Sequence, residues 1–204
     1  MSELVPDVID HLVGVEKDSA LDEIRAARRE TRVNAQKSWQ ALFAPEIAGE
    51  ASLVERYAIA VFVTGSHRDI GALDFYRGGL AAHERDQKVA AAVEAEAERG
   101  ATRGPYGHYP KGPLSVEDKT GPIHRVSDEN RRILGPRLAA ALEHAHLLVF
   151  RPRDASPAAL QSLLDAGWST TGAVTLSQLV AFLSFQIRVV AGLRALAAAP
   201  AKDI

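Results

Sequence analysis

Cysteine is absent from this 204-residue chain, and so is any marked excess of one charge. Without a thiol the protein can form no disulfide, no thiolate metal site and no cysteine nucleophile. Its 24 basic and 26 acidic residues give a formal charge of -2, which offers no electrostatic basis for binding nucleic acid or an anionic membrane. We therefore expect no thiol chemistry, no nucleic-acid partner and no membrane partner.

Strand-forming runs are scarce, and no secretory signal is present. Alanine and leucine are abundant, which is typical of a mainly helical protein, and the length suffices for one domain with a sizeable core. The first residues lack the basic and apolar regions of a signal peptide. We expect a single all-α domain, residues 1–204, located in the cytoplasm.

One long apolar run, residues 173–199, needs separate consideration. It contains Gln178, Gln186, Arg188 and Arg194, and an arginine near the centre of a bilayer costs roughly 2.5–3.5 kcal/mol on insertion scales. A helix buried in a bundle or in a subunit interface is therefore favoured over a membrane span. Its large apolar surface predicts a homo-oligomer.

The distribution of helix signals, glycines and prolines along the sequence divides the domain into four parts. These are an N-terminal helical arm at 1–50, two or more helices at 51–99, a Gly/Pro-rich loop at 100–126 and C-terminal helices at 127–199. Ser52 followed by Glu55 matches a capping box that opens a helix. That helix is expected to end near Thr64-Gly65, with Ser66 capping the next, which Gly78-Gly79 then interrupts.

His67 would then lie in the first turn of a helix. There the positive end of the helix dipole disfavours protonation, so a neutral imidazole suited to accept or donate a proton is expected at pH 7. The alternative is a partly exposed histidine that makes only a local hydrogen bond.

The stretch from Glu55 to Asp74 resembles the alkylhydroperoxidase D-like and carboxymuconolactone decarboxylase-like superfamily. In its peroxidase branch a Glu is followed, twelve residues later, by Cys, two residues, Cys, three residues and His. His67, Ile70 and Asp74 occupy those three positions here. Residues 144–193 also resemble the peroxidase-related branch. The resemblance implies an alkylhydroperoxidase D-like helical bundle, assembled as a dimer, trimer or hexamer, and a peroxidase-related role in antioxidant defence.

The resemblance also implies roles for individual residues. Glu55 would face a pocket and move protons, although it could equally serve only as the cap. Asp74 would share a helix face with His67, about 10 Å away by the rise per residue, unless it simply pairs with a neighbouring arginine. Tyr76, on the same helix, is a further candidate for substrate binding.

Arg188 is the charge least suited to its apolar surroundings. A desolvated guanidinium needs a carboxylate partner, and we expect Glu55 or Asp74 to provide it. With a neutral His67 nearby, Arg188 would form a pocket for a small carboxylate substrate; otherwise it is an interface residue or a residue whose charged end extends to water.

The remaining polar residues give weaker signals. His144 and His146 lie two residues apart, a spacing that points helical side chains in different directions and disfavours a metal site. His124 has no partner at a recognisable spacing, and Glu94, Glu96 and Glu98 look solvated. We expect no metal and no cofactor.

Three functions compete. A thiol peroxidase lacks its nucleophile. A cofactor-free acid-base lyase or isomerase of the decarboxylase type, acting on a small carboxylate or lactone, needs no thiol. A non-catalytic helical oligomer is the third. A pocket containing both His67 and Arg188 favours an enzyme, whereas a filled core favours a structural role.

Overall fold

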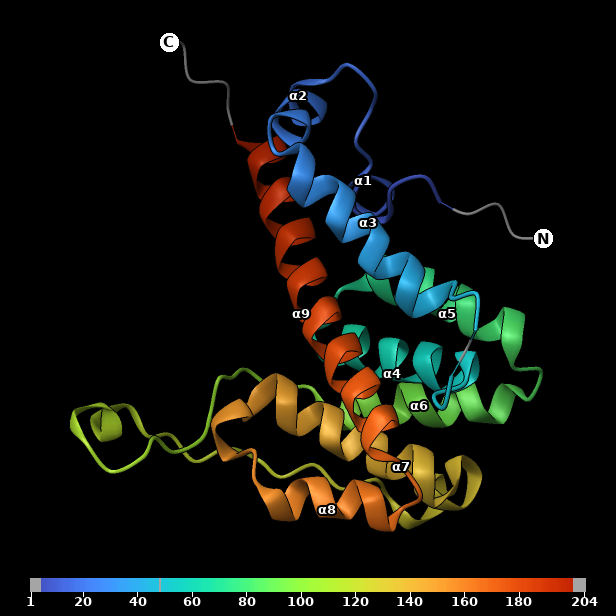
Figure 1. The fold of residues 1–204 in the computed structure, drawn as a ribbon, viewed down its shortest axis with the longest axis vertical. Helices are drawn as coiled ribbons and strands as arrows, with labels where there is room; N and C mark the ends of the chain where they lie inside the picture. Colours follow the sequence, from blue (N-terminus) through green and yellow to red (C-terminus); the bar gives the residue numbers. More distant parts are fainter. Residues whose placement is uncertain (1–4, 48, 200–204) are drawn as a thin grey trace.

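The computed structural model describes residues 5–47 and 49–199. The described part is all-α and has no β-strand, as the composition predicts (Figure 1). Its α-helices are α1 (Val8–Val13), α2 (Ala20–Ala27), α3 (Arg29–Phe43), α4 (Leu53–Ser66), α5 (Ile70–His83), α6 (Gln87–Gly100), α7 (Asp128–Phe150), α8 (Pro157–Asp165) and α9 (Thr170–Ala198).

The long helix α9 contacts helices from both halves of the chain. Helices α1 to α3 lie beside its C-terminal half, and α4, α7 and α8 pack toward its N-terminal half (Figure 1). The loop between α6 and α7, which contains a short 3-10 helix at Pro113–Glu117, extends away from the helices. By length and composition α9 could cross a membrane, but here one of its faces is buried against other helices.

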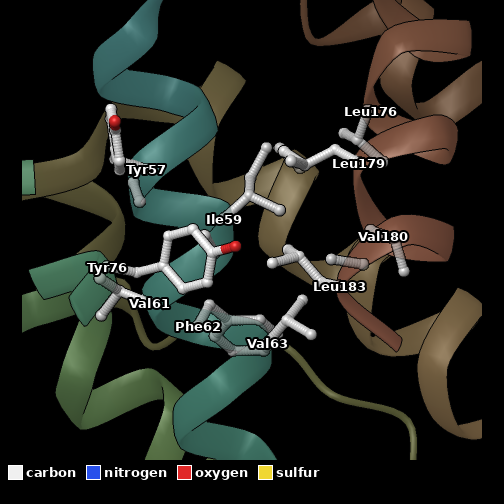
Figure 2. Close-up of a cluster of buried hydrophobic side chains, with 14 of the residues drawn as sticks. Tyr57, Ile59, Val61, Phe62, Val63, Tyr76, Leu176, Leu179, Val180 and Leu183 are labelled. Carbon is white, nitrogen blue, oxygen red and sulfur yellow. The ribbon is translucent and has the colours of Figure 1, made fainter. Parts of the chain in front are cut away.

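The central helix is α4, not α9. Every residue from Arg56 to Thr64 is buried, because α4 is surrounded by α5, α6, α7 and α9. A helix that is apolar on all sides belongs inside a bundle. Figure 2 shows Ile59 and Val63 of α4 facing Leu179 and Leu183 of α9.

The expected helix start at Ser52 is correct, and three further serines start helices in the same way. Ser19, Ser52, Ser127 and Ser156 each cap a helix through the side-chain oxygen. The capping box of Ser52 and Glu55 is complete, since each side chain bonds to the other's backbone amide. These bonds span only three residues, which is why sequence alone predicts them.

The junction between α4 and α5 differs from the expectation. Arg68 adopts a left-handed conformation (φ 58°), and the amide of Asp69 bonds to the Thr64 carbonyl at 3.1 Å, so α4 continues to Ser66. Asp69, not Ser66, caps α5. His67 therefore lies at the C-terminal end of α4 instead of the first turn of α5.

The expected break at Gly78-Gly79 is also wrong, because α5 runs through both residues. A Cβ on Gly79 would come 2.1 Å from a ring carbon of Tyr57. The glycine therefore allows α4 and α5 to approach closely.

Candidate functional site

A surface groove of about 630 Å³ collects residues from four parts of the chain. His67 reaches it from the end of α4, Phe150 from the end of α7, and Arg188 from α9, while residues 102–105 form the wall after α6. Its other lining residues are mainly apolar or small: Leu148, Val149, Pro152, Ser177, Val180, Ala181 and Ser184. The sequence prediction that His67 and Arg188 share a pocket is consistent with this geometry.

The protonation state of His67 follows from its contacts. Its Nδ1 lies 2.9 Å from the Val63 carbonyl, and because a carbonyl only accepts, Nδ1 carries the hydrogen and Nε2 keeps a lone pair. Burial lowers the pKa of His67, and the charge of Arg188 lowers it further, against the raising effect of the Val63 bond. The imidazole is therefore neutral at pH 7, but not because of a helix N-terminus, which was the reason expected from sequence.

Arg188 does not form the expected ion pair. Its guanidinium is exposed and donates to the Ser184 carbonyl at 2.7 Å, and no described carboxylate lies within ion-pair distance. Exposure to water removes the need for a carboxylate partner. The α9 arginine that does pair is Arg194, which lies 3.3 Å from Asp69.

Glu55 lies outside the groove. Besides capping α4, its carboxylate accepts from Arg137 of α7 at 2.6 Å, and Arg137 also stacks over the Trp168 ring at 4.2 Å. These contacts fasten the start of α4 to α7 and to the turn before α9. The geometry favours the capping alternative for this residue.

Asp74 and Tyr76 also lie away from the groove lining. Asp74 is exposed and pairs with Arg77, which in turn binds Glu94 of α6 at 2.7 Å. Tyr76 is fully buried and donates to Gln186 of α9 at 2.7 Å. Burial raises the pKa of its hydroxyl, and Figure 2 shows that hydroxyl directed toward α9. The shared face expected for Asp74 and His67 does not exist, because the two residues are on different elements.

Glu96 is the polar residue that sequence reasoning misjudged most. It is fully buried, not solvated. Its carboxylate accepts from Asn130 at 2.7 Å, from the Ser127 hydroxyl at 2.8 Å and from Arg99 at 2.5 Å. Although burial acts to raise the pKa of Glu96, these hydrogen bonds hold it below its ordinary value. Its position in the sequence could have indicated this burial, because Glu96 falls on the apolar face of α6, in register with Val89, Val93 and Gly100.

A series of contacts leads from this carboxylate through two histidines to Phe150 and His67, which line the groove. The Nε2 of His124 lies 3.2 Å from Glu96, and the His124 ring stacks on His146 with ring centres 5.1 Å apart. His146 contacts Phe150 at 4.9 Å, and Phe150 contacts His67 at 5.5 Å. We call His124, His146, Phe150 and His67 the ring column; sequence spacing could not reveal it, since its members come from three elements.

The described residues contain no cluster of three or more His, Asp or Glu side chains that could hold a metal ion. Comparison of the chain with protein-family models, with curated proteins and with solved structures finds no match. The site is therefore interpreted from its own geometry.

Proposed function

We propose that the groove binds a small organic carboxylate and that His67 moves a proton on it, as in a cofactor-free lyase or isomerase. The observation that carries this proposal is the shared groove of His67 and Arg188, together with the tautomer that leaves Nε2 of His67 unprotonated. A neutral imidazole is a suitable general base near pH 7.

The remaining lining suits such a ligand. The guanidinium of Arg188 can bind a carboxylate through paired N–H donors, and Arg103 adds a second positive charge at the other wall. Phe150, Val180 and Ala181 offer apolar surface for the organic part of the ligand. A carbon next to a carbonyl or lactone group, placed against His67, could then lose its proton to Nε2.

The family assignment is part of the proposal. The all-α architecture and the twelve-residue interval from Glu55 to His67 support a cysteine-less, alkylhydroperoxidase D-like bundle acting in the cytoplasm. A peroxidase-related ancestry fits that assignment. Thiol-dependent peroxidase turnover does not, because the chain has no cysteine.

The binding step is tested by titrating benzoate into the protein at pH 7 and following the His67 imidazole by NMR. Arg188→Met keeps the length of the side chain and removes its charge. Because a hydrogen bond to a charged group contributes about 1.5–3 kcal/mol, the affinity should fall about tenfold or more.

Arg132→Met is the matched control for this loss. Arg132 is also an exposed helical arginine that donates to the carbonyl four residues earlier, yet it does not line the groove. Equal loss of benzoate binding in both variants, or no binding to the unmodified protein, overturns the proposed ligand.

The proton-transfer step needs a separate measurement. In D₂O, a panel of small 2-oxo acids and lactones is followed by NMR for exchange of carbon-bound hydrogen. The protein should accelerate exchange for at least one compound, and His67→Gln should abolish the acceleration while benzoate still binds. Acceleration that persists in His67→Gln rules out His67 as the base.

A second candidate is a non-catalytic helical oligomer. Val174, Phe185 and Leu196 are exposed large apolar residues on α9, and Ala181 between them is also exposed. This exposed stripe of α9 supports self-association. A protein that forms an oligomer but fails both groove experiments would favour this function.

A further inference from the structure

We propose that His146 is a positioning residue for His67, acting through the ring of Phe150. The inference rests on the proposed role of His67 as the groove's proton acceptor, but it concerns a residue outside the groove. It assigns a role to His146, a buried histidine that does not line the groove.

The contacts form a continuous path. The rings of His67 and Phe150 stack at 5.5 Å with 27° between their planes. Phe150 also contacts the ring of His146, with ring centres 4.9 Å apart. His146 in turn stacks on His124 at 5.1 Å and 27°. Phe150 therefore contacts both the groove histidine and a buried histidine that is 1 % exposed.

The orientation of His146 is strongly determined. Its Nε2 donates to the carbonyl of Gly100 at 3.0 Å, so the ring in this tautomer has a bare Nδ1, which is buried with no hydrogen-bond partner among the described residues. A Cβ on Gly100 would come 3.2 Å from the His146 ring and 3.4 Å from Nδ1 of His124. The end of α6, where the groove wall begins, is thus packed directly against the ring column.

Burial keeps His146 neutral. It is the largest cause that lowers the pKa of His146, to about 4; His124 of the loop and Arg151 after α7 lower it further, against the raising effect of the Gly100 bond. Burial also lowers the pKa of His124, helped by the charge of Arg99 and opposed by the carboxylates of Glu96 and Glu143. At neutral pH the column therefore contains no imidazolium that would draw water inward.

The consequence for His67 follows from its burial. Desolvation is the largest cause of its lowered pKa, and Phe150 covers one face of the imidazole. If the contact with the fixed His146 ring is lost, the Phe150 ring can change its position and water can reach His67. The pKa of His67 would then rise toward the ordinary histidine value of about 6.5.

The test measures the pKa of His67 by NMR titration of its imidazole, without any ligand. His146→Leu removes the bond to Gly100 and the planar ring, so the pKa of His67 should rise. His146→Gln can keep an N–H directed at the Gly100 carbonyl, and the pKa should return at least halfway to the unmodified value. His144→Leu, a buried histidine on the same helix that lies outside the ring column, should leave the pKa unchanged.

Phe150→Leu provides a second route if His146→Leu is poorly folded. It should raise the pKa of His67 by itself, and adding His146→Gln in that background should change the pKa no further. An unchanged pKa in folded His146→Leu or in Phe150→Leu overturns the positioning role. Failure of benzoate to bind the unmodified protein would instead count against the proposed function, because the pKa measurement uses no ligand.

Discussion

At the scale of single residues, the largest effects on stability are expected from buried polar groups whose hydrogen-bond partners lie far away in the sequence. Glu96 accepts hydrogen bonds from α7 and from its own helix, and it faces His124 of the loop. Because a buried carboxylate is tolerated only when its oxygens are satisfied, this residue joins α6 to the start of α7.

Glu96→Ala should be strongly destabilising. The change leaves the Ser127 hydroxyl and the Asn130 amide without their buried acceptor, and an unsatisfied buried donor costs about 1–3 kcal/mol. Glu98→Ala, two residues away on the exposed face, should change the free energy of unfolding by less than about 0.5 kcal/mol. Urea denaturation measures both, and similar effects for the two variants would contradict the burial argument.

The buried histidines predict a stability that depends on pH. The pKa of His146 in the folded protein is about 4, below the unfolded value of about 6.5, so the unfolded state takes up the proton first. The stability is complete above about pH 6.5 and is lost as the pH falls toward 4. The loss from His146 is at most on the order of 3 kcal/mol, at about 1.4 kcal/mol per pH unit.

Urea denaturation between pH 7.5 and 4.5 measures this dependence at pH values above those at which most carboxylates titrate. His146→Gln cannot titrate, so its free energy of unfolding should fall less steeply over the same range. A slope equal to that of the unmodified protein would mean that His146 is as easily protonated in the folded as in the unfolded state.

At the scale of elements, the contact between α4 and α5 depends on one glycine, whose role is not apparent from the sequence. Gly78 and Gly79 are neighbours within α5 and look equivalent in the sequence, but only Gly79 faces α4. A Cβ there meets the buried ring of Tyr57, whereas one on Gly78 meets nothing within 4 Å.

Alanine substitutions at these two positions should therefore have opposite signs. Gly79→Ala overpacks the interface between α4 and α5 and should cost about 1–3 kcal/mol. Gly78→Ala should stabilise the protein by about 0.5–1 kcal/mol, since alanine is favoured over glycine inside a helix. Thermal unfolding followed by circular dichroism distinguishes the two, and destabilisation by both would show that α5 is packed more tightly at Gly78 than the contacts indicate.

At the scale of the whole molecule, α9 has one face in the core of the chain and one face toward solvent. Leu183 and Ile187, which repeat at helical spacing in the apolar run, are buried in that core. Charged substitutions at these two positions would disrupt the fold itself. The residues available to a second copy are those of the exposed stripe outside the groove, such as Val174 and Phe185.

We expect the protein to form a homo-oligomer through this stripe, with a mass that is a multiple of 21.9 kDa. Phe185→Asp should shift it toward the single-chain mass while leaving the helical circular dichroism spectrum intact, because the side chain is 39 % exposed. Light scattering at micromolar concentration measures the mass. Ile24→Asp, an equally exposed position on α2 (45 %), serves as the control and should leave the mass unchanged.

The sequence by itself determined the helical class and several helix starts. The capping serines and the box of Ser52 and Glu55 act over three residues, so local bonding suffices to specify them. Absence of cysteine likewise excluded thiol chemistry without any structure.

The tertiary structure alone decided which of the candidate residues lie together. It placed His67 and Arg188 in one groove, left Glu55 and Asp74 outside it, and buried Glu96 beside His124. Each of these outcomes depends on which helix faces pack together across tens of residues. A side chain's burial and charge environment are properties of those packed faces, and neither helix periodicity nor motif spacing specifies the neighbour that each face will meet.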